Sequence, residues 1–251
     1  MDWNVYEGSA IERLPKIVRP AALIARHAKM RLFPEKPHHR SDGIATRHND
    51  GFHDTPAFRK AYARAVDAAG ADFGIPYRVH QALWCARTAS SVGGAFVELG
   101  TGRGFIMSAI MEDTQTRRPV HLFDTFLPAY PRLSGEQIGP ASPYYAASFD
   151  RTRANFAEWP NVTLHQGDAF KTLPAAHLGD VAFLHVDMNH PDPEVFGIRT
   201  LWPKMPKGAV MLLDDYAHAD HHVQYCAINA LADELGFSVL STPTGQGIVV
   251  K

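Results

Sequence analysis

From residue 95 onward, short apolar runs alternate with longer segments that are typical of helices. Each apolar run is bounded by glycine, proline or acidic residues, as expected for buried strands of a parallel sheet that is covered on both faces. This alternation predicts an α/β fold with a mostly parallel sheet and helices on both faces. The strands are expected at 95–97, 120–123, 161–165, 181–186, 209–213, 237–240 and 247–250.

Two helices are expected before the first strand, at Thr55–Ala71 and Pro76–Ala89. The residues before about Gly51 are rich in Arg, Lys, His and Pro, which predicts helices and loops outside the sheet. We therefore divide the chain into an extension at 1–75 and a main domain at 76–251.

Two segments interrupt this regular pattern. The stretch 127–149 is rich in Pro, Gly and Tyr. We expect it to form a lid over the site where a substrate binds, with a passive surface loop as an equal alternative. Residues 11–33 are apolar on one side with basic residues interspersed, as in helices that lie on anionic membranes. Pro15 and Pro20 interrupt this segment, so we favour a cap over the active site or a contact in a homo-oligomer.

A glycine-rich turn follows the first strand. Glu98 precedes the run Gly100-Thr101-Gly102-Arg103-Gly104, and glycines at such a junction let a ligand approach the main chain. A dinucleotide site needs a third glycine one position later, where the chain has Phe105. An acid at Glu98 would face phosphates unfavourably but suits an ammonium group, so the turn favours S-adenosylmethionine (SAM) over NAD. A purely structural turn is the alternative.

Acidic residues also follow the next two strands. Asp124, followed by Thr125, has about the 20-residue spacing expected for an acid that binds ribose hydroxyls. Asp168, within Gly167-Asp168-Ala169, could accept from the adenine amino group. Each acid alone is more simply a helix N-cap, but three acids at successive strand ends favour a cofactor site.

Further acids follow the last two parallel strands. Asp187 and Asn189 come after one strand, and Asp214 and Asp215 after the other, which makes an all-oxygen ligand set suited to Mg²⁺ or another hard divalent cation. The alternative is that these acids cap helices and turns. His190 and His218 follow closely, so either could orient an acceptor or remove its proton.

Taken together, these motifs resemble class I SAM-dependent methyltransferases, and more narrowly the macrocin O-methyltransferase family of metal-dependent sugar methyltransferases. The narrower signals are Phe123-Asp124-Thr125-Phe126 and Leu213-Asp214-Asp215-Tyr216. The resemblance implies a Rossmann-like fold of seven strands with an antiparallel C-terminal edge hairpin. At Asn189 this chain departs from the family, which usually has a second Asp there.

The resemblance also implies roles. Glu98 and the glycine turn would contact the methionine part of SAM, Asp124 the ribose and Asp168 the adenine. Asp187, Asp214 and Asp215 would bind the metal, and Asp187 would be the leading general base, with His218 second. The expected activity is divalent-metal-dependent methylation of a hydroxyl on a sugar or glycosylated natural product. A methyltransferase for catechol-like phenols and a non-catalytic SAM-binding protein remain open, and a dehydrogenase is a distant fourth.

The composition is typical of a globular enzyme that acts on small molecules. The chain has 251 residues, of which 45% are hydrophobic and 20% charged, as in ordinary globular domains. A formal net charge of −1 gives no field to attract nucleic acid. The two cysteines form no motif, and we recognise no signal peptide and no apolar stretch long enough to span a bilayer. A cytoplasmic location is therefore expected.

Overall fold

The computed structural model describes residues 15–18, 20–22, 24–25, 39–46, 48–126 and 148–251. The chain divides into two compact units, a smaller one of residues 1–40 and 45–48 and a larger one of residues 41–44 and 49–251. The expected lid at 127–149 lies almost wholly outside the described residues, as does most of the basic segment at 11–33. The functional argument concerns the larger unit.

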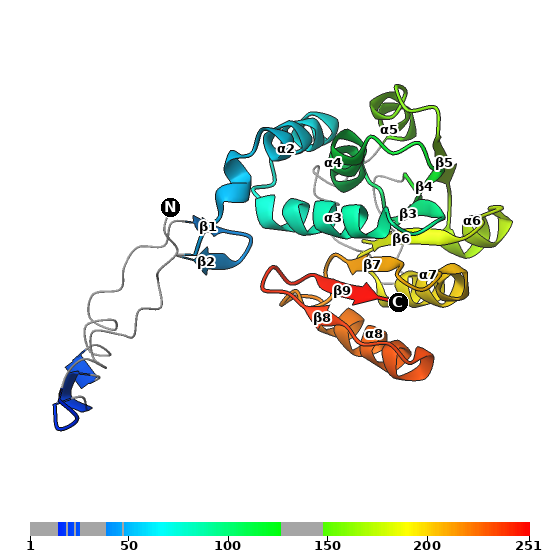
Figure 1. The fold of residues 1–251 in the computed structure, drawn as a ribbon. Helices are drawn as coiled ribbons and strands as arrows, with labels where there is room; N and C mark the ends of the chain where they lie inside the picture. Colours follow the sequence, from blue (N-terminus) through cyan, green and yellow to red (C-terminus); the bar gives the residue numbers. More distant parts are fainter. Residues whose placement is uncertain (1–14, 19, 23, 26–38, 47, 127–147) are drawn as a thin grey trace. The chain divides into compact units, whose positions relative to one another are not determined.

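Seven strands of the larger unit form one sheet, in the order β5-β4-β3-β6-β7-β9-β8 (Figure 1). The first five of these are parallel, and β9 runs antiparallel to both β7 and β8. This topology confirms the predicted fold class, including the antiparallel hairpin at the C-terminal edge. The strands are β3 (Ala95–Leu99), β4 (Val120–Asp124), β5 (Val162–Gln166), β6 (Val181–Val186), β7 (Val210–Leu213), β8 (Leu240–Ser241) and β9 (Gly247–Val250).

Strand β8 is shorter and later than the predicted strand at 237–240. Gly236 ends the preceding helix in the left-handed region, and the backbone N–H of Phe237 still donates to the carbonyl of Ala232 at 3.0 Å. Phe237 therefore belongs to the helix terminus, because its N–H satisfies one of the last helical carbonyls.

Helices connect the strands in the predicted order. Thr55 caps the first long helix by accepting from the backbone N–H of Phe58, and Pro56 occupies its first position, a combination that favours helix initiation. The helices are α2 (Pro56–Ala69), α3 (Pro76–Ala89), α4 (Phe105–Thr114), α5 (Phe149–Asn155), α6 (Ala169–Ala175), α7 (Pro191–Leu201) and α8 (His222–Leu235). Shorter elements are the strands β1 (His39–Ser41) and β2 (Ile44–Thr46) and the 3-10 turns η1 (Gly51–Asp54) and η2 (Trp202–Lys204).

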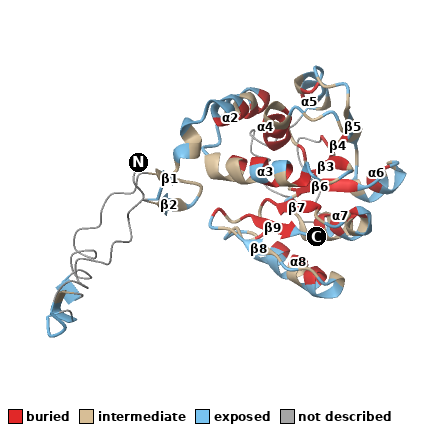
Figure 2. Ribbon diagram, in the orientation of Figure 1, coloured by how far each residue is buried: buried red, intermediate tan, exposed pale blue. Residues whose placement is uncertain are grey.

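The two faces of the sheet bury separate hydrophobic cores. Successive strand side chains point to opposite faces, so Phe96 of β3 packs in the core with α2, α3 and α4, while Val97 packs in the core with α6, α7 and α8. Figure 2 shows the central strands β3, β6 and β7 as buried. Complete burial explains why these strands are mostly apolar on both faces.

Helix α2 belongs to the main unit. Its Ala61 and Ala65 are fully buried in the same core as Phe96 and Ile110. The boundary that we placed between residues 75 and 76 thus falls inside the larger unit, between α2 and α3. Among the described helices, none combines the length and apolar character needed to cross a bilayer.

Candidate active site

The glycine turn after β3 holds the centre of the site. Gly100 adopts φ +90°, and a Cβ on it would lie 1.8 Å from the carbonyl oxygen of Asp187, so only glycine fits there. Gly102, at φ +55°, has no atom of the described residues within 4 Å of its hypothetical Cβ. The backbone N–H groups of Gly100 and Thr101 both donate to the carbonyl of Phe123, at 2.8 and 3.2 Å. The turn therefore packs closely against the end of β6 at Gly100, whereas at Gly102 the described residues leave space beside it.

The remaining loop residues continue this arrangement. Gly104 is the N-cap of α4, and Thr101 is buried. The turn lies at the carboxyl end of β3. In the sheet, β4 and β5 lie on one side of β3, and β6 and β7 lie on the other, so the strand order reverses at this point. Open α/β sheets bind their ligands at such a switch point.

Asp124 ends β4 beside this turn. Its Oδ2 accepts from the backbone N–H of Gly102, and its Oδ1 from that of Phe126, both at 2.7 Å. Burial raises the pKa of the Asp124 carboxyl, while these backbone hydrogen bonds lower it. Because a carboxylate offers about four acceptor sites, Asp124 keeps capacity for a diol. Thr125 follows directly at the strand end.

Asp168 lies one strand further along the same edge. It is exposed and caps α6, since its Oδ1 accepts from the backbone N–H of Phe170 at 3.0 Å. Ala169 begins that helix, and Gly167 donates its N–H to the carbonyl of Asp124 at 2.9 Å. The structure thus brings the ends of β3, β4 and β5 together, and Asp168 has the capping role that the simpler alternative foresaw.

Glu98 lies within β3, with 2% of its surface exposed. Its Oε1 is 2.9 Å from Nδ1 of His185, its direct neighbour in the sheet register. Its Oε2 is buried without a hydrogen-bond partner among the described residues. Burial raises the pKa of Glu98 and His185 lowers it. The main contact of Glu98 in this structure is therefore with the buried imidazole of His185.

His185 links Glu98 to the acids after β7. Its Nε2 is 3.8 Å from Oδ1 of Asp214, a charge–charge separation rather than a hydrogen bond. Burial disfavours the charged imidazole, but Asp214 and Glu98 outweigh it and raise the pKa of His185 to about 10. A protonated His185 thus neutralises part of this acidic cluster at neutral pH.

The three acids predicted as metal ligands do converge. One carboxylate oxygen each of Asp187, Asp214 and Asp215 lies within 4.8 Å of the others. Arg78 of α3, which the sequence did not indicate, lies between two of them: its Nη1 is 2.7 Å from Oδ2 of Asp214 and 3.1 Å from Oδ1 of Asp215. The other oxygen of Asp214 accepts from Nε2 of Gln246 at 2.7 Å.

These contacts decide how a cation could bind. Although burial opposes ionisation, His185 and Arg78 lower the pKa of Asp214 to about 2, so this carboxylate is charged and already paired. Both of its oxygens are occupied by protein donors. In the all-oxygen set of Asp187, Asp214 and Asp215, a bound Mg²⁺ would therefore compete with Arg78 for the carboxylates of Asp214 and Asp215.

Asp187 is the acid that Arg78 does not contact directly. Its partial burial and the negative charge of Asp214 raise the pKa of the Asp187 carboxyl well above its usual range. Asn189, at φ +56°, donates its Nδ2 to Oδ1 of Asp187 at 3.2 Å. Asn189 thus presents its amide nitrogen rather than the oxygen that metal binding would need.

The two histidines singled out from the sequence have different positions. His190 caps α7, where its Nδ1 accepts from the backbone N–H of Asp192 at 3.3 Å. His218 instead belongs to a group with Asp215 and His221, with ligand atoms within 4.8 Å of one another. The sequence thus placed His218 near the acids correctly, whereas His190 has the ordinary role of a helix cap.

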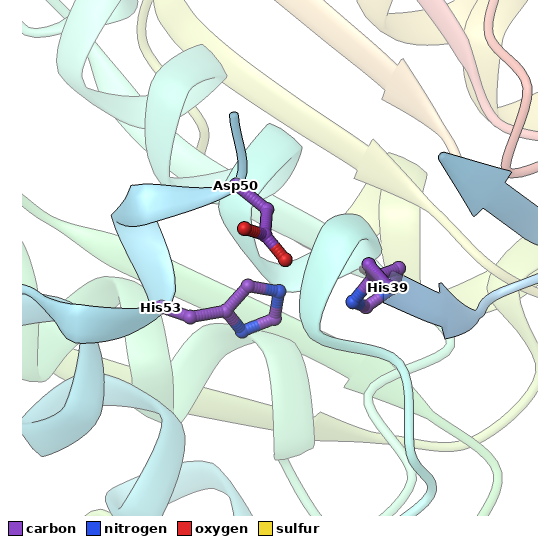
Figure 3. A group of neighbouring side chains, drawn as sticks. All are labelled: His39, Asp50 and His53. Carbon is purple, nitrogen blue, oxygen red and sulfur yellow. The ribbon is translucent and has the colours of Figure 1, made fainter. Parts of the chain in front are cut away.

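Two further polar side chains lie just before α2. Asp50 and His53 come from the N-cap and body of η1 (Figure 3), and the third residue drawn there, His39, belongs to the smaller unit. The ring of His53 stacks on Phe52 at 4.1 Å and meets Tyr77 edge-on. This aromatic packing accounts for His53 as a structural residue.

Comparisons with known proteins find a methyltransferase domain in the part of the chain that contains this site. Residues 97–216 match the model of a family described as a methyltransferase domain. The matched segment runs from β3 to just beyond β7 and contains the glycine turn and all the strand-end acids. The search of curated proteins found no match.

Three solved structures have a similar fold. The O-methyltransferase NovP is 20% identical, with a TM-score of 0.62 over 80% of this chain and 93% of its own. CalS11, a TDP-rhamnose 3'-O-methyltransferase of calicheamicin biosynthesis, is 15% identical, with a TM-score of 0.52 over 79% and 96%. An O-methyltransferase from Bacillus cereus in complex with SAH is 12% identical, with a TM-score of 0.51 over 91% and 97%.

The methyltransferase domain matched at residues 97–216 and the Rossmann-like fold support the predicted enzyme class, a SAM-dependent methyltransferase. Membership of the narrower macrocin family stays a prediction.

Proposed function

We propose that this protein transfers the methyl group of SAM to a hydroxyl of a sugar or a glycosylated small molecule. The observation that carries the proposal is the position of Asp187. Its carbonyl lies against Gly100 of the cofactor turn, and its carboxylate lies beside Asp214 and Asp215. A potential proton acceptor is thus held where the cofactor turn meets the acidic cluster.

The cofactor side of the site fits SAM. The space beside Gly102 is open, and Asp124 next to it has acceptor capacity for a ribose diol. In this proposal Asp168 and the turn around Gly167 contact the adenine. Glu98 holds His185 through Oε1, and its Oε2, which has no hydrogen-bond partner among the described residues, is the proposed contact to the amino group of SAM.

Bound SAM supplies an electrophilic methyl group that an acceptor oxygen can attack in line. A hydroxyl is a poor nucleophile until its proton is removed, and Asp187 is the base that we assign to this step. A raised pKa makes Asp187 a stronger proton acceptor than an ordinary surface carboxylate. His218, on the far side of Asp215, remains the second candidate.

The acceptor class rests on the resemblance and on relatives of similar fold, which include a TDP-rhamnose 3'-O-methyltransferase. Several acids at one edge of the sheet are also suited to hydrogen-bonding the hydroxyls of a sugar.

Transfer of radiolabelled methyl from SAM to a panel of nucleotide sugars, glycosides and planar catechols tests the proposal. We expect turnover on the sugars, a loss of at least 100-fold in kcat for Asp187→Asn, and near-normal turnover for Asp192→Asn, an exposed acid on α7. Turnover on catechols alone would assign the alternative acceptor class. SAM binding with no transfer to any acceptor would refute the enzymatic proposal.

A further inference from the structure

The segment between β7 and α8 carries two imidazoles beside a carboxylate. Asp215, His218 and His221 each place one ligand atom within 4.8 Å of the others. All three are partly buried, and the rings of His218 and His221 meet edge-on with centroids 5.4 Å apart. This set contains two nitrogen ligands, unlike the all-oxygen set predicted from the sequence.

Backbone hydrogen bonds hold the three residues at this spacing. The N–H of His218 donates to the carbonyl of Asp215 at 3.3 Å, and the N–H of His221 to that of His218 at 3.0 Å. The N–H of Ala217 donates to the carbonyl of Gly245 in the β8–β9 turn at 2.7 Å. The ligand atoms are therefore arranged before any ion binds.

Asp215 has one oxygen left for a new partner. Its Oδ1 pairs with Arg78, while its Oδ2 is 3.8 Å from Nε2 of His221, too far for a hydrogen bond. Two ligands bonded at 2.0–2.2 Å to one tetrahedral ion stand about 3.4 Å apart. The observed gap is thus close to the separation that a shared ion would require.

His221 is oriented by a second layer of contacts. Its Nδ1 lies against Oε1 of Gln224, whose Nε2 donates to Oε1 of Glu194 at 2.9 Å. Gln224 and Glu194 are both only 4% exposed. Because the amide oxygen can only accept, Nδ1 of His221 carries the proton and Nε2 presents its lone pair toward Asp215. Metal-binding histidines usually have such a partner on their other nitrogen.

We infer that Asp215, His218 and His221 form a binding site for a borderline transition-metal ion such as Zn²⁺. Imidazole ligands favour zinc and its neighbours over Mg²⁺. Asp214 does not belong to this set, and its two carboxylate oxygens instead accept from Arg78 and Gln246. His218 gives up only a long contact, 3.4 Å from its Nδ1 to the backbone N of Asp220, if that nitrogen binds the ion.

This inference is independent of methyl transfer, because its test measures metal binding directly. The full chain, stripped with EDTA, is titrated with Co²⁺ as a coloured substitute for Zn²⁺. We expect one Co²⁺ per chain, a d–d absorption band typical of nitrogen ligands, and bleaching of that band by one equivalent of Zn²⁺ but not by excess Mg²⁺.

Variants locate the site. His218→Ala and His221→Ala should each weaken Co²⁺ binding more than tenfold. His222→Ala is the matched control, since His222 is the exposed neighbour in the chain and should leave binding unchanged. Circular dichroism and calorimetric SAM binding check that each variant folds and show separately whether the cofactor site is intact.

Three results would overturn the inference. The first is that Co²⁺ does not bind stoichiometrically. The second is an equal loss of Co²⁺ affinity in all three histidine variants. The third is a Co²⁺ affinity that depends on Asp187 but on neither His218 nor His221.

Discussion

Gly100→Ala and Gly102→Ala form a matched pair that tests the packing of the cofactor turn. Both glycines have positive φ, so either alanine costs about 1 to 2 kcal/mol of backbone strain. Only at Gly100 does the new Cβ also meet the main chain, 1.8 Å from the carbonyl oxygen of Asp187. A tolerable contact requires at least 3.0 Å, so β3 and β6 must separate locally.

The structure sets the expected magnitudes. Overpacking that forces a backbone shift costs about 1 to 3 kcal/mol, so Gly100→Ala should lose about 2 to 5 kcal/mol in total. In a chain of this size that corresponds to a Tm lower by about 4 to 20 °C. Gly102→Ala should lose only about 2 to 8 °C, because no atom of the described residues lies within 4 Å of its Cβ.

Differential scanning calorimetry and SAM titration measure the two effects separately. We expect Gly102→Ala to fold well but to bind SAM more weakly, since its methyl group projects into the open side of the turn. Equal melting temperatures for the two variants would refute the reasoning, because the close approach of Asp187 would then have no energetic consequence.

Three further predictions concern the buried charges and the helix cap. Arg78→Met should lower the free energy of unfolding by about 3 to 5 kcal/mol in urea titrations, since Asp214 loses its partner, whereas Arg199→Ala in an exposed pair should change it little. The pKa of His185 is raised from 6.5 to about 10, so its contribution is complete below pH 6.5 and lost by about pH 10. Unfolding free energies across that range should fall more steeply in the wild type than in His185→Gln. Asp168→Ala should remove both the α6 cap, worth about 1 kcal/mol, and SAM affinity. Asp168→Ser should retain stability and lose only affinity, and unchanged SAM binding in both variants would contradict an adenine contact.

The local pattern of the chain was sufficient for the fold. Continuous apolar runs such as 181–186 predicted central strands, because a strand covered on both faces has no polar side. The positions of Asp124 and Asp168 at successive strand ends were also predictable, since parallel strands end at the same edge of a sheet. These inferences needed only the periodicity of each element and the order of elements.

The pairing of charges depended on the tertiary structure. Arg78 and Asp214 are 136 positions apart, and nothing near either residue indicates the other. Their contact arises because α3 packs over the sheet beside the end of β7. Strand pairing brings the other partners together: His185 lies opposite Glu98 in the register of β6 and β3, and the pairing of β7 with β9 brings Gln246 to Asp214.

The sequence by itself therefore determined the sheet, the glycine turn and which acids would gather, because periodicity and strand direction are local properties. Only the tertiary structure decided how those acids are neutralised, by Arg78 and His185, and that His221 joins Asp215 and His218. The physical reason is that a buried carboxylate takes whichever cationic or donor group the packing brings near, and sequence distance does not limit that choice.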